Sequence, residues 1–177
     1  MRIIAGKHRG RVLTEFKGRQ IRPTADRAKE AIFNILQTDI FGADFLDLYS
    51  GTGNMGLEAL SRGANSAVLV DVSKESVSIM QANNKMLKEN AEIFCQDALS
   101  FVLSTKKKFD IIFLDPPYDV DATSVLKAIG ETGILNEDGI VIYEHSEDFN
   151  VEEIDKLEHR STRKYGVAHF EIYGERK

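Results

Sequence analysis

The chain has 177 residues, of which 42% are hydrophobic and 29% are charged, and its formal net charge is −5. This length and composition are typical of one globular domain with a sizeable core, and they exclude a low-complexity chain. No segment is apolar enough to span a membrane or to form the core of a signal peptide, and the single cysteine excludes a disulfide framework, so we expect a cytoplasmic protein.

The amino-terminal segment is basic, in contrast to the rest of the chain. Residues 1–30 carry nine Lys or Arg against three acids, a net charge of +6 that leaves −11 for the remainder. Short apolar stretches alternate there with glycines, a pattern that predicts a small β-hairpin or arm. An acidic body with a basic arm indicates a polyanionic partner, although a solvated basic tail explains the charge equally well.

A helix is predicted to follow this arm. The sequence Arg-Pro-Thr at residues 22–24 ends the arm, and Thr24 or Asp26 can cap a helix that runs to about Gln37. The apolar residues of this helix fall on one face, and Lys29 lies toward its polar side. We therefore expect residues 1–40 to form an arm and a helix that pack on a catalytic domain of residues 41–177.

From residue 44 onward, apolar runs alternate with amphipathic segments. Strands are predicted at 45–49, 67–70, 93–95, 111–114 and 139–143, and helices at 54–62, 73–88, 98–104 and 122–130. This alternation predicts a doubly wound, mostly parallel α/β sheet. The tail, 157–173, alternates around Gly166 and predicts an antiparallel hairpin on the sheet edge. The apolar run that ends at Cys95 predicts a buried, unreactive thiol.

The turn after the first predicted strand is rich in glycine. Gly51 and Gly53 let the backbone pass close to a ligand, and the helix that begins at Asn54 can pack tightly on the strand. Asp71 lies twenty residues beyond Gly51 and ends the second strand, where it can accept hydrogen bonds from ribose hydroxyls. Together these features indicate a nucleoside-containing ligand in a Rossmann-like sheet.

Two classes of ligand fit this turn, a dinucleotide and S-adenosylmethionine, and Asp47 favours the second. A pyrophosphate prefers amide N–H groups with no carboxylate nearby, whereas S-adenosylmethionine carries an ammonium and a sulfonium. A role of Asp47 in capping its own turn is the less favoured alternative. Asp97 follows the third strand, and it can reach an adenine amino group, cap the helix that begins at Ala98, or do both.

Asp115-Pro116-Pro117-Tyr118 follows the fourth strand, at the edge where open α/β sheets bind ligands. The consecutive prolines force the backbone out of the sheet. The Asp115 carboxylate and the Pro116 carbonyl can accept the two hydrogens of an exocyclic base amine and free its lone pair for attack on a methyl group. Tyr118 can stack on a base turned out of its helix or loop. A turn with a capping Asp is the minor alternative.

These motifs resemble those of one family. Asp-Pro-Pro-Tyr is similar to the amino-methyltransferase signature of class I S-adenosylmethionine-dependent enzymes. The amino-terminal Met-Arg-Ile-Ile-Ala-Gly, the Arg-Pro-Thr-x-Asp-Arg of residues 22–27 and the Gly-Leu-Glu-Ala-Leu-Ser-Arg-Gly-Ala of residues 56–64 more narrowly resemble the bacterial RsmD-like small-subunit (16S) rRNA guanine-N2 methyltransferases. The resemblance covers most of residues 1–145, with Asp71 where many relatives have Glu.

The resemblance implies methyl transfer from S-adenosylmethionine to the N2 amine of a guanine in small-subunit rRNA, and we expect a monomer that needs no metal. It implies that the cosubstrate is bound by Asp47, Gly51, Gly53, Asn54, Asp71, Asp97 and Ala98. The catalytic residues it implies are Asp115, Pro116, Pro117 and Tyr118. The residues expected to contact RNA, together with Tyr118, are Arg2, Lys7, Arg9, Arg11, Arg22, Thr24 and Arg27.

Three alternatives stay open. The tetrapeptide does not choose the base, so methylation of an adenine amine in DNA or RNA also fits; a non-catalytic rRNA-binding assembly factor and a dinucleotide oxidoreductase follow. The histidines are spread along the sequence without the spacing of metal ligands: His8, His145, His159 and His169. Glu144 and His145 end the fifth predicted strand, where they could line the pocket, although capping or a surface position is favoured.

Overall fold

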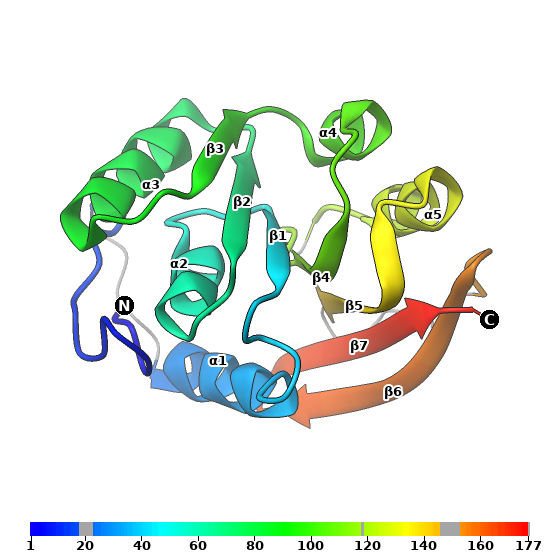
Figure 1. Ribbon diagram of the computed structural model, residues 1–177, viewed down its shortest axis with the longest axis horizontal. Helices are drawn as coiled ribbons and strands as arrows, with labels where there is room; N and C mark the ends of the chain where they lie inside the picture. Colours follow the sequence, from blue (N-terminus) through cyan, green and yellow to red (C-terminus); the bar gives the residue numbers. More distant parts are fainter. Residues whose placement is uncertain (18–22, 118, 146–152, 177) are drawn as a thin grey trace.

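The computed structural model describes residues 1–17, 23–117, 119–145 and 153–176, and of residues 23–25 only the backbone (Figure 1). Arg22 and Tyr118, two of the predicted site residues, lie outside the described residues, as does the side chain of Thr24. In the described part of the chain, no helix is long and apolar enough to cross a membrane.

A seven-stranded sheet runs through the molecule, as predicted. Its strands are β1 (Asp44–Leu48), β2 (Ser66–Asp71), β3 (Glu92–Cys95), β4 (Phe109–Leu114), β5 (Leu135–His145), β6 (Leu157–Tyr165) and β7 (Ala168–Glu175), in the spatial order β3-β2-β1-β4-β5-β7-β6. The first five strands are parallel, and β7 pairs antiparallel with β5 and β6. The strand order reverses between β1 and β4, which is where open parallel sheets bind ligands.

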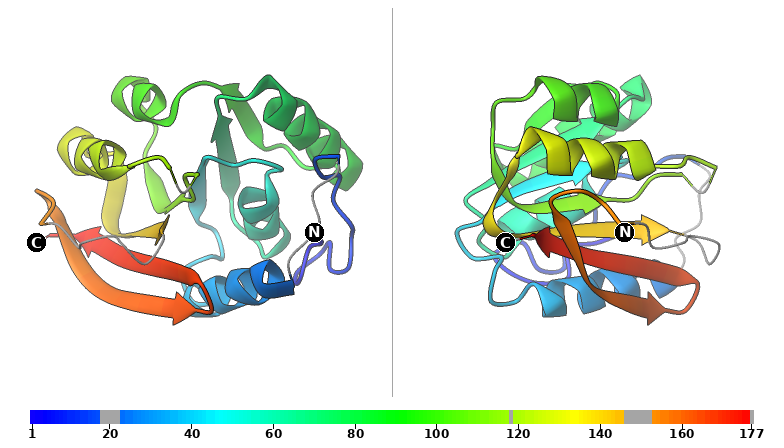
Figure 2. Two further views of the ribbon diagram at one scale, coloured as in Figure 1. Left: turned by 180° about the vertical axis from the view of Figure 1, so that it is seen from behind. Right: turned by 90° about the vertical axis from the view of Figure 1, so that its right-hand side faces the viewer.

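Helices cover both faces of the sheet (Figure 2). One face is covered by α1 (Pro23–Ile35), α2 (Asn54–Ser61) and α3 (Lys74–Leu87), and the other by α4 (Ala98–Ser104) and α5 (Thr123–Thr132). Each interface has its own core: Phe33, Leu57 and Met80 pack on the first face, and Phe101 and Leu126 on the second. The parallel strands are apolar on both sides because both sides are covered.

The amino-terminal arm is less regular than the predicted hairpin. It has one isolated antiparallel bridge, between Arg2 and Val12, which is flanked by hydrogen bonds from the Ile3 amide to the Arg11 carbonyl (2.9 Å) and from the Leu13 amide to the Met1 carbonyl (3.0 Å). The arm therefore forms a surface loop in which residues 1–3 pair with residues 11–13, and contacts with the underlying helices hold it in place.

Buried charges of two helices fasten the arm. The Glu58 carboxylate of α2 is fully buried and accepts hydrogen bonds from the amides of Ile4 (2.8 Å) and Ala5 (3.0 Å). It also pairs with Lys29 of α1 (3.0 Å) and with Arg62 (2.8 Å). The prediction that Lys29 lies on a polar face was wrong. Its side chain is only 2% exposed, because it turns inward to form an ion pair with the buried carboxylate of Glu58.

Two further details differ from prediction. Helix α1 ends at Ile35, earlier than Gln37, and β5 begins at Leu135, four residues before the predicted start. Cys95 is exposed, so the prediction of a buried thiol was wrong. The reason is its place at the end of β3, which is the edge strand of the sheet and is not covered as the central strands are.

Candidate active site

Four carboxylates gather at the carboxyl ends of β1, β2, β4 and β5. Leu48, Val70, Leu114 and Tyr143 are aligned across these strands, and all four belong to the core under α4 and α5. Successive side chains of a strand point to opposite faces. The neighbouring acids therefore project toward the face covered by α1, α2 and α3: Asp47, Asp71, Asp115 and Glu144.

The glycine turn brings the start of α2 beside these acids. Gly51 and Gly53 have φ values of 55° and 77°, in the left-handed region that favours glycine. The Gly51 amide donates to Asp71 Oδ2 (2.8 Å), and the Gly53 amide donates to the Ser50 carbonyl (2.8 Å). A Cβ atom at Gly51 would meet no atom within 4 Å, so the space beside this residue is open to a ligand.

Asp47 is buried under the turn. Its side chain is only 1% exposed, and Oδ2 accepts a hydrogen bond from the Gly56 amide (2.9 Å) in the first turn of α2. The less favoured alternative, a capping role, is thus present, although Asp47 caps the helix rather than its own turn. Burial, and to a smaller extent Asp115 and Asp71, raise the pKa of Asp47 to about 7. A cationic ligand nearby would favour the ionised form.

The other predicted cosubstrate residues surround the same edge. Asp71 Oδ1 accepts from the Ser73 amide (2.8 Å), so each oxygen of Asp71 has one backbone donor and keeps a lone pair for a ligand. Asp97 is exposed and caps α4 through the Ser100 amide (2.9 Å), which leaves its second oxygen available. Ala98 is buried at the start of α4. Asn54 is already engaged, because its Oδ1 accepts from Lys29 (2.8 Å).

Asp115 lies at the end of β4, and its amide still bonds to the Leu48 carbonyl of β1 (3.4 Å). Water can reach the side chain, but protein surrounds it on several sides, and this desolvation raises its pKa to about 6. Pro116 is buried and Pro117 is exposed. The carboxylate and the Pro116 carbonyl thus begin the loop beside the glycine turn, at the carboxyl edge of the sheet where the sequence predicted the motif to lie.

Glu144 also lies at this edge, a position that the sequence left open only as the less favoured alternative. It is half-buried beside Asp115, and burial together with the Asp115 charge raises its pKa to about 8. A capping or surface position was favoured for it. The signal that could have found it is its place one residue after Tyr143, because Tyr143 pairs with Leu114, the residue before Asp115.

The basic residues predicted to contact RNA are exposed but spread along the arm. Arg2, Lys7, Arg9, Arg11 and Arg27 all reach solvent. Lys7 pairs with Glu89 (2.7 Å), just beyond the carboxyl end of α3. Arg2 lies nearer, since its carbonyl accepts from the same Lys29 that binds Asn54.

The arm also reaches the glycine turn at a second point. Asn83 of α3 accepts a hydrogen bond from the Thr14 amide (2.7 Å) and donates to the carbonyls of Thr14 and Thr52 (3.0 Å each). Thr52 belongs to the glycine turn, so the arm is linked to both sides of the turn through buried polar groups.

Three of the four histidines, His145, His159 and His169, converge in space, which corrects the interpretation that all are scattered, whereas His8 contacts Glu89. The buried Glu171 carboxylate of β7 is within 2.9 Å of His145 Nε2 and 2.6 Å of His159 Nε2, and it accepts from Thr162 (2.6 Å). The rings of His145 and His169 meet edge to face at 5.7 Å. These residues lie far apart in sequence and converge because β5, β6 and β7 pair. Among the described residues, no cluster has the arrangement of a metal site.

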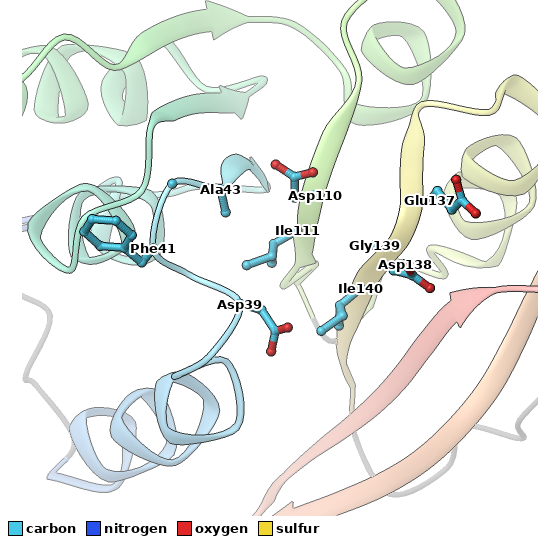
Figure 3. Close-up of a pocket in the computed structure, with 10 residues that line it drawn as sticks. Asp39, Phe41, Ala43, Asp110, Ile111, Glu137, Asp138, Gly139 and Ile140 are labelled. Carbon is cyan, nitrogen blue, oxygen red and sulfur yellow. The ribbon is translucent and has the colours of Figure 1, made fainter.

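A hollow of about 220 Å³ lies at the opposite, amino-terminal edge of the strands (Figure 3). Figure 3 shows the carboxylates around it, from Asp39 after α1, Asp110 of β4, and Glu137 and Asp138 at the start of β5. The Asp110 side chain already accepts from the Asp44 amide and from Asn136 (2.8 Å each). Because the hollow lies at the amino-terminal edge and Asp115 at the carboxyl edge of the sheet, the residues of the hollow cannot contact a substrate bound at Asp115.

Substituting Asp47 with asparagine is expected to flatten the pH dependence of stability. The pKa of Asp47 is about 7 in the folded protein and ordinary in the unfolded chain, so between about pH 4 and 7 the folded state holds a proton that the unfolded state has released. Stability due to this group therefore falls as pH rises through that window, by about 3 kcal/mol between pH 5 and 8. Asparagine keeps an oxygen acceptor for Gly56 without titrating.

Urea unfolding of the parent and of Asp47→Asn at pH 5 and pH 8 measures this difference. Titrating groups remote from Asp47 contribute equally to both proteins, so the comparison isolates Asp47 and its interaction with Asp115 and Asp71. Parallel pH profiles for the two proteins would contradict the assignment.

Substituting Gly51 with alanine is expected to weaken S-adenosylmethionine binding by tenfold or more, or about 1.4 kcal/mol, because the new methyl group occupies the open space beside the turn. The positive φ adds a cost of roughly 1–2 kcal/mol in stability. Gly42→Ala is a matched control: its φ is 77°, its Cβ would also meet no atom within 4 Å, and it lies at the opposite edge. Calorimetry should show that only Gly51→Ala loses affinity, although both variants lose stability; equal affinities would refute the proposed position of the ligand.

The chain is similar in sequence to several known proteins, among them two that are named as rRNA methyltransferases. Residues 1–174 match the family described as "Conserved hypothetical protein 95". "Putative rRNA methyltransferase YlbH" of Bacillus subtilis is 34% identical over 99% of this chain and 100% of its own length. "Ribosomal RNA small subunit methyltransferase D" of Haemophilus influenzae is 34% identical over 84% of this chain and 80% of its own.

Solved structures share the whole fold. "Putative methyltransferase yhhF" of Escherichia coli superposes with a TM-score of 0.89 at 29% identity, covering 99% of this chain and 97% of that one. The Thermus thermophilus "16S rRNA N2 G1207 methyltransferase (RsmC)", solved with AdoMet and guanosine, has a TM-score of 0.71 at 21% identity, covering 91% and 45%. The sheet is thus that of the class I S-adenosylmethionine-dependent methyltransferases.

Proposed function

Because the chain belongs to the conserved hypothetical protein 95 family, that of the RsmD-like rRNA methyltransferases, we propose that it methylates the exocyclic N2 amine of a guanine in small-subunit rRNA. The methyl donor is S-adenosylmethionine. The observation that carries this proposal is the position of Asp115 and Pro116 at the end of β4, beside the glycine turn that follows β1.

The residues at this edge fit the charge and shape of the cosubstrate. When bound, S-adenosylmethionine supplies an electrophilic methyl group on a sulfonium centre. The open space beside Gly51 admits a ligand next to the backbone, and the free lone pairs of Asp71 can accept bonds from ribose hydroxyls. Asp47 adds a buried negative charge that favours an ammonium or sulfonium.

Asp115 and the Pro116 carbonyl orient the amine. The nitrogen lone pair of a base amine is delocalised into the ring, which makes the nitrogen a weak nucleophile. Two acceptors already in place bind its two hydrogens and draw the nitrogen toward tetrahedral geometry, and such preorganised groups stabilise developing charge most. As the C–N bond forms and the C–S bond breaks, the amine becomes cationic. It then loses one proton, which the Asp115 carboxylate, with a pKa of about 6, can accept.

The basic amino-terminal arm supports the proposal that the target base is part of an RNA. Arg2, Arg9, Arg11 and Arg27 expose guanidinium groups, which suit phosphate oxygens. Since the arm is tied to the glycine turn through Lys29 and Asn83, phosphates held by its near end would lie close to the target base. Tyr118, which follows Pro117 in the sequence, would stack on the target base.

Guanine is preferred to adenine as the target on two grounds. The relatives named above include small-subunit rRNA enzymes, and the Thermus thermophilus neighbour is an N2-guanine methyltransferase bound to guanosine. The amino-terminal arm and the Arg-Pro-Thr segment resemble the guanine-N2 family and not adenine methyltransferases in general.

Nucleoside analysis tests the base directly. Small-subunit rRNA, free and assembled into particles, is incubated with the protein and labelled S-adenosylmethionine, then digested to nucleosides. Label in N2-methylguanosine is the expected result. Label in N6-methyladenosine would replace the proposal with adenine methylation, and absence of label from every RNA and particle would favour a non-catalytic assembly factor.

A further inference from the structure

Glu144 occupies a defined place next to the acceptor pair of the site. Leu114 of β4 and Tyr143 of β5 are paired in register, so the residues that follow them, Asp115 and Glu144, are neighbours on adjacent strands. Adjacent strands lie about 4.8 Å apart, and both side chains project to the same face of the sheet. Glu144 is half-buried, and within the described part of the chain no amide or side chain donates a hydrogen bond to its carboxylate.

The bases differ at the atom beside the reactive amine. In guanine one of the two ring atoms beside the C2 amine is N1, which carries a hydrogen, and the other is the bare N3. In adenine the atom next to the C6 amine is also a ring nitrogen, but it has a lone pair and no hydrogen. An ionised carboxylate beside Asp115 would accept a hydrogen bond from guanine N1–H but would face the lone pair of adenine N1, and an unmatched pair of acceptors lowers affinity.

We propose that Glu144 accepts the N1–H of the target guanine while Asp115 and the Pro116 carbonyl hold its N2 amine, and that Glu144 thereby selects guanine against adenine. This inference rests on the proposed function, because it assumes a base amine at Asp115. It assigns the choice of base, which Asp-Pro-Pro-Tyr leaves open, to a residue outside that motif.

The role requires the ionised form of Glu144. Burial, and then the charge of Asp115, raise its pKa to about 8 in the free protein, so the free group is mostly protonated at neutral pH and could then donate to a bare N1. A hydrogen bond from guanine N1–H favours the ionised form, so the preference for guanine is expected to rise as the pH rises through about 8. The base would then lie along the ends of β4 and β5, with its reactive amine on the side of the glycine turn of β1.

The test compares two bases that share the reactive amine. The nucleotide methylated by the parent protein is first located in small-subunit rRNA, and a matched RNA is made with 2-aminopurine at that position. 2-Aminopurine keeps the C2 amine but has a bare N1 and no O6. The variants are Glu144→Gln, which keeps the size of the side chain and can also donate, and Glu137→Gln, an exposed carboxylate at the other end of the same strand.

The ratio of kcat/KM for the guanine RNA to that for the 2-aminopurine RNA is the measured quantity. A matched pair of hydrogen bonds discriminates bases by about 1–3 kcal/mol, so the parent should prefer guanine by roughly 5- to 150-fold. Glu144→Gln should remove or reverse this preference, a loss of about fivefold or more, since the amide can donate to the bare N1, and Glu137→Gln should keep the preference of the parent. Loss of O6 affects all three proteins alike and cancels in the comparison.

Two readouts distinguish a failure of the proposed role of Glu144 from a failure of the proposed function on which it rests. If the parent makes no N2-methylguanosine, the proposed function fails before any variant is used. If the parent does so and Glu144→Gln keeps the full preference for guanine, the role of Glu144 is overturned. Calorimetry with S-adenosylmethionine checks that Glu144→Gln retains its cosubstrate site. Should that variant not fold, Glu144→Asp takes its place: it keeps an acceptor only and must still prefer guanine, and a lost preference would overturn the inference.

Discussion

Replacing Asp115 with alanine is expected to lower methyl transfer to rRNA by about 10²- to 10³-fold, the usual effect of removing one preorganised group that stabilises developing charge. The Pro116 carbonyl stays in place but binds only one of the two amine hydrogens. The acceptor for the departing proton is lost at the same time. Because Asp115 is reached by water and supports no other described residue through its carboxylate, the fold should be unchanged.

Single-turnover rates with saturating S-adenosylmethionine measure this effect, and calorimetry measures cosubstrate binding. Binding should stay equal or weaken only slightly through the loss of one negative charge. Asp155→Ala is the control, since it removes an exposed carboxylate from the segment between β5 and β6. If Asp115→Ala methylates as fast as Asp155→Ala, the amine is not oriented by this carboxylate.

Replacing Glu58 with alanine should destabilise the protein by about 3–5 kcal/mol, the range found when one partner of a buried ion pair is removed. Glu58 accepts from the Ile4 and Ala5 amides and pairs with Lys29 and Arg62. Its loss leaves four donors without their acceptor. The largest part of this free-energy cost is expected at Lys29, because its side chain is almost fully buried and burial already lowers its pKa.

Urea unfolding of Glu58→Ala against Glu131→Ala, an exposed acid on α5, gives the difference. A double variant, Lys29→Met with Glu58→Met, should be more stable than Glu58→Ala, because the nearly fully buried charge of Lys29 is no longer present without its partner. A midpoint for Glu58→Ala equal to that of Glu131→Ala would show that the arm is held by other contacts. Protease cleavage within residues 1–14 should rise in Glu58→Ala, since the arm amides lose their anchor.

The sheet and its main turns could be predicted because their signals are local. Apolar runs separated by amphipathic segments give β1 to β5, and the alternation around Gly166 gives the β6–β7 hairpin. The glycine turn and the Asp115 loop were likewise predicted at the correct edge, since parallel strands place their carboxyl ends together. What these stretches share is that each is specified by its own few residues.

Features that depend on pairing between distant segments could not be predicted. Glu144 lies beside Asp115 only because β5 pairs with β4, and His145 meets Glu171 only because β7 pairs with β5. Lys29 follows a helical pattern typical of an exposed position, yet it turns inward to a charge on α2. In each case a tertiary contact outweighs the local preference.

The acidic edge has a further consequence for turnover. Under the proposed function the sulfonium of the cosubstrate becomes an uncharged thioether when the methyl group leaves. The four carboxylates at this edge, Asp47 among them, then attract the spent molecule less than a fresh one, because the positive charge of the sulfonium has gone. The same side chains that draw the donor in would thus favour its exchange after each cycle, and product inhibition should increase when Asp47 or Asp71 is neutralised.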